Sequence, residues 1–150
     1  ELGLFAKATV AEKYTVRIRI LHGIVSGHEA LTGDASVGAL IYQTRERDFS
    51  AFVGAKTTFI GSKYAQKFFG INSEQSVISG IETYDPGAGL RDINLNFGTY
   101  WKFKNNWSLN SFAEYSRALG STAHSPLVST FGSPNQFKIG FNVSYTFYYD

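Results

Sequence analysis

Residues 136–147 alternate between polar and apolar side chains at every position. Successive side chains of a strand point to opposite faces, so this pattern predicts a strand with one apolar and one polar face. Its length is about 10 residues, which a tilted strand needs to cross a bilayer. The apolar positions are Phe137, Ile139, Phe141, Val143, Tyr145 and Phe147. A strand of this kind at the end of a chain is typical of an outer-membrane β-barrel.

Six earlier segments have the same period of two, at 2–10, 14–20, about 35–44, 49–59, 90–103 and 107–115. The third is the least regular, because its two sets of alternate positions both carry apolar residues and its faces cannot be assigned. We therefore predict seven strands and an all-β fold, an antiparallel transmembrane β-barrel of the outer membrane.

The connections between these segments alternate in length. They are about two to four residues after the first, third and fifth segments, whereas the long ones span 21–34, 60–89 and 117–135. Short turns on one rim and long loops on the other are the plan of outer-membrane barrels, with the turns in the periplasm. Within the middle loop we expect short helices over 62–69 and 73–78, the second with Ser73 as its N-cap.

This alternation also predicts direction. If the last strand ends in the periplasm, the first begins on the extracellular side. Bacterial single-chain barrels have an even number of strands with both ends in the periplasm. We therefore expect residues 1–150 to form a single β-barrel domain, the C-terminal part of a longer barrel with at least one further N-terminal strand.

Composition agrees with a strand-rich fold. The chain has 13 Phe, nine Tyr and 15 Gly but only three Pro, a mixture that favours strands and turns. The absence of Cys excludes disulfides and thiol chemistry. No apolar run is long enough for a transmembrane helix. The net charge of +2 comes from scattered residues, so nucleic acid is not an expected partner.

Most charged residues of the predicted strands lie on their polar faces. On the barrel hypothesis, the residues that line the lumen are Lys7, Arg17, Arg19, Lys56, Asp92, Asn94, Asn96, Glu114 and Lys138, together with Lys102. Cations exceed anions in this set, so an open lumen would prefer anions. The alternative is a narrow barrel filled by salt-bridged side chains. Because an unpaired buried charge is costly, we expect Arg17 or Arg19 to meet Glu114 or Asp92.

Aromatic residues flank the turn at 104–106 and the end of the last strand. Trp101, Phe103, Trp107, Tyr145 and Phe147 would form an aromatic girdle at the membrane interface, where amphipathic rings lie at headgroup level. The alternative is plain packing against a soluble partner sheet.

Candidate catalytic groups lie in or beside the long loops. His22, His28 and His124 have Ser26 and Ser125 near them in sequence. A serine nucleophile needs a base within hydrogen-bond reach and a third group that orients the base, and nothing in the sequence fixes that geometry, so ordinary surface loops are the favoured interpretation. Similarly, Asp85 and Asp92 lack the alternating oxygen ligands of a calcium loop. We predict no metal site, no cofactor and no enzymatic activity.

Several short motifs, taken in order, resemble the C-terminal part of the MipA/OmpV family. They lie at 64–71, 84–92 (YDPGAGLRD), 107–109, 115–120, 125–128 and 132–137, and more weakly at 27–28 and 33–34. The resemblance implies an outer-membrane barrel of ten or so strands that acts as a scaffold between a murein transglycosylase and a murein synthase. For some members it implies a role in permeability or adhesion.

The resemblance also implies an assembly signal at the end of the chain. The barrel-assembly machinery reads a polar residue, a glycine and spaced apolar residues, which match Lys138, Gly140, Val143 and Tyr145. One departure is the tail of residues 148–150, because such chains usually stop at the aromatic that corresponds to Phe147.

Two functions remain in view for a protein embedded in outer-membrane lipid. The first is a non-enzymatic scaffold for murein-remodelling enzymes. The second is a porin-like channel whose basic lumen favours anionic or small polar solutes. A hydrolase at the outer rim and a soluble ligand-binding barrel are further alternatives.

Overall fold

The computed structural model describes residues 2–23, 30–104 and 106–147. Within these ranges the strands are β1 (Leu2–Val10), β2 (Tyr14–His22), β3 (Leu31–Gln43), β4 (Phe49–Ile60), β5 (Gly89–Lys104), β6 (Trp107–Ala118) and β7 (Asn135–Tyr145). The helices are α1 (Ser62–Phe69), α2 (Ser73–Ser79), α3 (Gly120–His124) and α4 (Pro126–Ser129).

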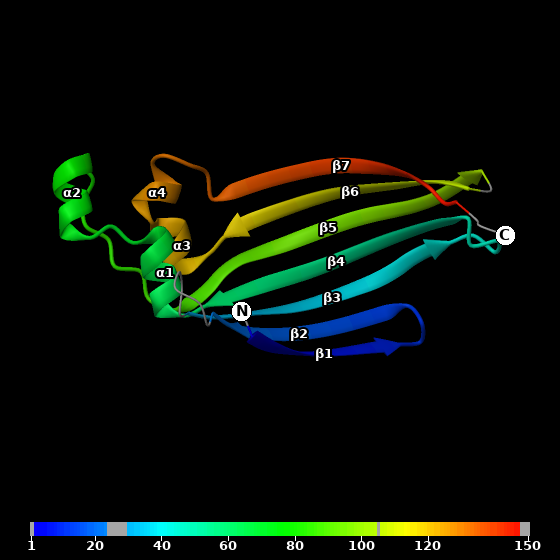
Figure 1. Ribbon diagram of the computed structural model, residues 1–150, viewed down its shortest axis with the longest axis horizontal. Coiled ribbons are helices and arrows are strands. Elements are labelled where there is room, and N and C mark those ends of the chain that lie inside the picture. The colour runs from blue at the N-terminus through cyan, green and yellow to red at the C-terminus, as the bar shows by residue number, and fades with distance from the viewer. Residues whose placement is uncertain (1, 24–29, 105, 148–150) are drawn as a thin grey trace.

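The strands form one antiparallel sheet, and their order in the sheet is their order in the chain (Figure 1). Every strand therefore pairs with its neighbours in sequence. The predicted all-β class is confirmed. Within the described residues the sheet is open, because β1 and β7 each pair on one side only. The arrangement is consistent with the wall of a β-barrel that these strands do not close.

The two ends of the sheet differ sharply. The tight turns that follow β1, β3 and β5 lie at one end, and the four helices gather at the other (Figure 1). Helix α2 stands farthest from the sheet, and none of its residues is buried. No helix in the described ranges has the length and hydropathy that a membrane crossing requires.

Most of the small buried core lies at the helix end, and Ser50 and Ala51 are buried at the other end, near the start of β4. Ile60, Ala65 and Ile71 are its main apolar members, and Thr122 and Ser125 are buried beside them. The Ser125 hydroxyl donates a hydrogen bond to the Phe69 carbonyl oxygen at 2.7 Å. This bond ties the loop of α3 and α4 to the end of α1.

The two faces of the sheet have different environments. Along β2, Tyr14, Val16, Ile18 and Ile20 are exposed, whereas Thr15, Arg17 and Arg19 are partly buried. Partial burial of the alternate positions identifies their face as the concave one. We call the face that carries Arg17 the inner face, and the opposite one the outer face.

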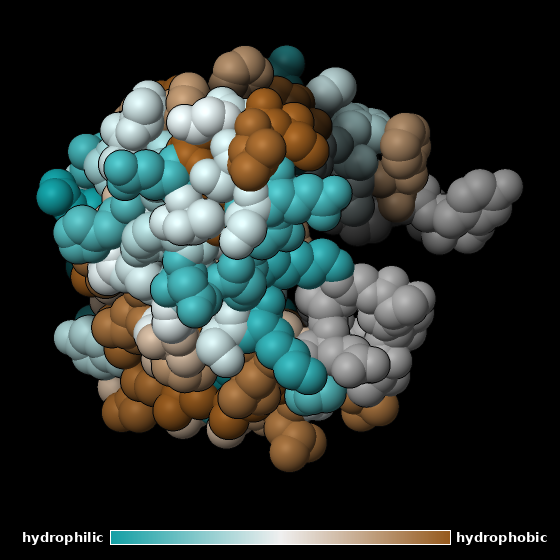
Figure 2. Space-filling model, turned by 90° about the vertical axis from the view of Figure 1, so that its left-hand side faces the viewer, coloured by the Kyte–Doolittle hydropathy of each residue, from teal (hydrophilic) through white to brown (hydrophobic). Residues whose placement is uncertain are grey.

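The outer face is apolar and exposed in all seven strands. Most of its large apolar side chains are 37–83% exposed, and soluble monomers rarely expose so large a contiguous apolar surface. They include Leu4 and Val10 in β1, Ile18 and Ile20 in β2, Val37 in β3, Val53 and Phe59 in β4, Leu95 and Phe97 in β5, Tyr115 in β6, and Phe137, Ile139 and Phe141 in β7. Seen from the helix end, hydrophobic residues gather along the lower border of the molecule (Figure 2).

Three irregularities break the alternation of faces. The β3–β4 register shifts between Leu40 and Tyr42, which explains why the faces of this segment could not be assigned from its sequence. Similar shifts occur between Thr58 and Phe59 opposite β5, and between Lys102 and Lys104. Each shift leaves one extra residue in one strand, namely Ile41 in β3 and Arg91 and Phe103 in β5, and the alternation of that strand changes phase there.

Two expectations about the loops need correction. Strand β3 begins at Leu31, so Asp34 lies in a strand and not in a loop. Its start was hidden because Gly33 and Ala35 occupy its outer positions and give no apolar signal. The N-cap of α2 is Asn72, so the prediction of Ser73 was wrong. The Asn72 side chain accepts a hydrogen bond from the Gln75 backbone N–H, and the Asn72 backbone N–H donates one to the Gln75 side chain.

Candidate functional site: the basic inner face

The inner face carries polar side chains in continuous rows across the strands. One row runs through Lys7, Arg17, Ser36, Lys56, Asn94, Ser116 and Gln136, each opposite the next. A second contains Arg19, Asp34, Thr58 and Asp92, and a third Asn96, Glu114 and Lys138. The register therefore brings the nine residues expected to line a lumen onto one face.

The charges pair differently from the sequence-based expectation. Arg19 pairs with Asp34 at 2.7 Å, Arg91 with Asp92 at 2.5 Å, and Lys138 with Glu114 at 3.1 Å. The prediction that Arg17 or Arg19 would meet Glu114 or Asp92 was wrong. Arg19 with Asp34, and Lys138 with Glu114, are directly opposed on neighbouring strands, where side chains lie closest. Asp92 is held instead by its neighbour in the sequence, Arg91.

The strengths of these pairs follow from their exposure. The Asp34 side chain is 8% exposed, and Arg19 approaches it through both Nε and Nη2. The Lys138 and Glu114 side chains are 59% and 31% exposed, and such a pair contributes about 0–1 kcal/mol. Loss of Arg19 would leave the buried Asp34 carboxylate without its cation, which costs more than the loss of an exposed partner.

A groove of about 510 Å³ lies on the inner face between β1 and β5. Its lining includes the small residues Ser36, Gly38 and Gly54, which we call its floor, the polar residues Lys7, Arg17, Lys56, Thr15 and Asn96, and the apolar residues Leu40 and Phe52. Glu12 and Lys13 line it at the turn end. The Arg17 Nε atom is buried and has no hydrogen-bond partner in the described part of the chain. We call this feature the basic groove.

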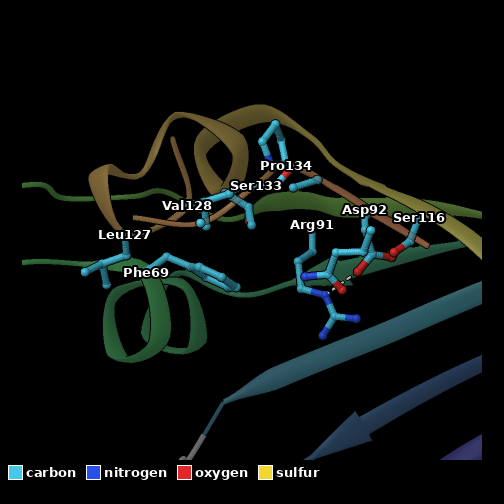
Figure 3. Close-up of a pocket in the computed structure, with 12 residues that line it drawn as sticks. Phe69, Arg91, Asp92, Ser116, Leu127, Val128, Ser133 and Pro134 are labelled. Carbon is cyan, nitrogen blue, oxygen red and sulfur yellow. Dashed lines mark hydrogen bonds and ion pairs between the residues drawn. The ribbon is translucent and has the colours of Figure 1, made fainter. Parts of the chain in front are cut away.

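A second cavity, of about 370 Å³, lies at the helix end of the inner face. Phe69, Leu127 and Val128 approach it from the helices, and the Arg91–Asp92 pair lies on the sheet side with Ser116 next to Asp92 (Figure 3). Asn94 also donates to Asp92 at 2.7 Å. The pair is thus part of a hydrogen-bonded network under the helices.

Sequence reasoning missed two charged residues of this face. Asp34 was placed in a loop, and Arg91 was not assigned to a face. Arg91 lies at the β4–β5 irregularity, which lets it share a face with its neighbour Asp92. Asp34 can be recognised as the partner of Arg19 only once the register of β2 and β3 is known.

The aromatic residues form two clusters near the tight turns. The ring centroids of Trp101 and Phe103 are 5.5 Å apart. Those of Trp107 and Tyr145 are 4.9 Å apart, and those of Tyr145 and Phe147 are 4.6 Å apart. All five side chains are at least 40% exposed. A membrane girdle at this level stays a prediction.

The proposed assembly-signal residues lie in and beside the exposed edge of β7. Lys138 and Gly140 occupy inner positions, and Val143 and Tyr145 occupy outer ones. Recognition of these residues by the assembly machinery is likewise a prediction. The tail at 148–150 lies outside the described residues.

The candidate catalytic groups are not brought together. The Ser125 hydroxyl is buried and bonded to Phe69, while the His124 Nδ1 atom lies 2.8 Å from the Gly120 carbonyl oxygen. His22 ends β2 in an exposed position, and Ser26 and His28 lie outside the described residues. Across the described ranges, no group of three or more His, Cys, Asp or Glu is placed to hold a metal ion.

Comparison with known proteins gives one match. A family model described as MltA-interacting protein MipA matches residues 1–147. No curated protein and no solved structure matches the chain.

Proposed function

The chain belongs to the MipA family, and from this premise we propose that it forms part of a β-barrel wall in the bacterial outer membrane. The outer face carries this proposal. Apolar side chains that are exposed along all seven strands would cost about 25 cal/mol per Å² in water, and contact with lipid tails removes that cost. The antiparallel ladder satisfies the backbone groups that lipid cannot.

The orientation of the sheet in the membrane follows from the difference between its turn end and its helix end. We place the tight turns in the periplasm and the helices outside the cell, as the barrel plan requires. Trp101, Phe103, Trp107, Tyr145 and Phe147 then lie as a girdle at the periplasmic headgroups, where their exposed rings are stable.

The proposed role is a non-enzymatic scaffold for murein-remodelling enzymes, as the family's name suggests. The turn between β3 and β4 supports it because this turn is charged and held by hydrogen bonds. Arg45, Glu46 and Arg47 are exposed, and backbone bonds from Arg47 to Thr44 (3.0 Å) and from Lys102 to Asp48 (2.6 Å) hold their turn. In the described residues, the cations of this rim are Lys13, Arg45, Arg47 and Lys104 and its acids are Glu12, Glu46 and Asp48, so the rim offers a small excess of positive charge to a partner.

The scaffold proposal is tested by the affinity of the full chain for an MltA-type lytic transglycosylase. Arg45→Glu with Arg47→Glu should weaken binding by about tenfold or more, because the charges would repel the partner's complementary patch. The matched control is Lys63→Glu with Lys67→Glu, on α1 at the opposite end, which should leave binding unchanged. Failure of the parent to bind a transglycosylase or a synthase, or equal losses in the two variants, would contradict the proposal.

A second candidate function is a porin-like channel for anionic or small polar solutes. The inner face supports it. Among its described residues, seven cations stand against three anions: Lys7, Arg17, Arg19, Lys56, Arg91, Lys102 and Lys138 against Asp34, Asp92 and Glu114. Such an excess favours anions over cations inside a barrel.

Conductance separates the two candidates. The full chain in planar bilayers should give discrete current steps, with chloride more permeant than potassium under a salt gradient. A silent bilayer would end the channel proposal and leave the scaffold intact. Current steps from a protein that binds no murein enzyme would support the channel and contradict the scaffold.

A further inference from the structure

Among the described residues, the row of cations in the basic groove contains no carboxylate. Lys7 lies directly opposite Arg17, and like charges in that relation are destabilising. Arg17 and Lys56 both lie opposite Ser36, one on each side. Ser36 therefore has one cation on each side, and Lys7 lies beyond Arg17 in the same row.

The carboxylates of the inner face are committed elsewhere. Asp34, Asp92 and Glu114 are held by Arg19, Arg91 and Lys138 respectively. In the described residues, Glu12 is the acid that also lines the groove, and it belongs to the turn after β1 and not to the cation row. The buried Arg17 Nε, which has no partner there, points to a missing acceptor.

The floor of the groove is shaped to admit such an acceptor. Ser36, Gly38 and Gly54 have small side chains or none, so they leave space in the groove. A side chain at Gly54 would meet Asn96 at 2.8 Å, so this glycine lets the Asn96 amide lie across the floor. The Ser36 hydroxyl, the Asn96 amide and the Arg17 guanidinium thus line the same groove as the ammonium groups of Lys7 and Lys56.

We propose that the basic groove binds the oxyanion group of a small solute, a carboxylate or a phosphate, between Arg17 and Lys56. Guanidinium and ammonium groups form charge-assisted hydrogen bonds with such oxygens, and the Ser36 and Asn96 side chains supply further donors. The groove opens on the inner face, away from the apolar outer face, so its ligand is a dissolved solute and not a lipid headgroup. This inference rests on the channel function proposed above, which gives the solute access.

Binding is measured by equilibrium dialysis of labelled inorganic phosphate against the detergent-solubilised full chain. The double variant Arg17→Gln with Lys56→Gln should bind at least about tenfold more weakly, because it loses two charged donors. Gly38→Leu should also abolish binding by filling the floor. A Cβ at Gly38 meets its nearest atom, the Val53 carbonyl oxygen, at 3.7 Å, so the backbone can accept it.

The matched control is Lys102→Gln, which removes one charge from the same face outside the groove and should change phosphate affinity less than about twofold. Succinate should displace phosphate, whereas chloride at the same concentration should not. Equal binding by all variants, equal displacement by chloride, or no binding by the parent would overturn the proposal. Phosphate binding without conductance would refute the channel alone, and conductance without binding would refute the groove alone.

Discussion

Gly140 and Phe112 lie directly opposite each other on the inner face of β7 and β6. A Cβ atom on Gly140 would lie 2.6 Å from Cε1 of the Phe112 ring. The ring therefore covers the glycine, and the pair forms a close contact between the last two strands. Gly98 lies on the other side of Phe112 in the same row, but its nearest neighbour would be 3.5 Å away.

We expect Gly140→Ala to destabilise the folded protein by about 1–3 kcal/mol, because the ring must leave its position. Gly98→Ala is the control and should change the free energy of unfolding by less than about 0.5 kcal/mol. Reversible urea unfolding in lipid vesicles measures both. In a Phe112→Ala background the two alanine variants should have equal effects, and a difference that persists there would disprove the ring contact.

Single residues also mark the limit of what the sequence can predict. Alternation along a strand requires no knowledge of the neighbouring strands. It places Arg19, Lys56, Asn94 and Lys138 each on the polar face of its own strand. The partner of a charge depends on the register between strands, which alternation does not determine. This is why Arg19 was matched with the wrong acid and why Asp34, its actual partner, was overlooked.

At the scale of elements, α2 is held by its own ends more than by packing. Asn72 and Gln75 form a reciprocal capping box at its start, and Gly80 ends it in the left-handed region with φ of 71°. Since no residue of α2 is buried, its stability is separate from that of the sheet.

We expect Asn72→Ala to cost α2 about 1 kcal/mol, the usual contribution of an N-cap. Amide hydrogen exchange should then be faster within α2, while unfolding of the sheet stays unchanged. Ser73→Ala, at the neighbouring position, is the control and should leave exchange in α2 close to that of the parent. Similar acceleration in both variants would show that the capping box does not stabilise the helix.

The elements themselves were largely predictable. Strong alternation located the strands at 2–10, 49–60 and 107–118 within a few residues, because an amphipathic strand repeats its signal at every position. The register shifts at Leu40 and Thr58 left no signature of their own, because a bulge is set by the partner strand as much as by local sequence. Helices α3 and α4 were not foreseen, since four or five residues are too few for a helical period to show.

At the scale of the whole molecule, the apolar outer face and the polar inner face invert the pattern of a soluble protein. The small core at the helix end could not hold so extended a sheet by itself, since so much large apolar surface elsewhere is exposed. We therefore expect the free energy of folding to depend mainly on the contact between the outer face and lipid.

Two lysine substitutions on neighbouring strands test this expectation. Phe97→Lys places a charge on the outer face of β5 and should destabilise the protein in lipid by about 2–4 kcal/mol. Asn110→Lys places the same charge on the inner face of β6 and should cost less than about 1 kcal/mol. Folding into phosphatidylcholine vesicles is the measurement, and equal tolerance of the two lysines would show that the outer face does not meet lipid.

The match between strand order and chain order has a consequence for how the protein folds. Each tight turn brings two strands together with little loss of chain entropy, whereas closing a longer loop costs about 0.6 kcal/mol more for each doubling of its length. The longest connection, 61–88, separates β4 from β5. We expect hairpins β1–β2, β3–β4 and β5–β6 to form first, and the junction of β4 with β5 to be the slow step that joins the two halves.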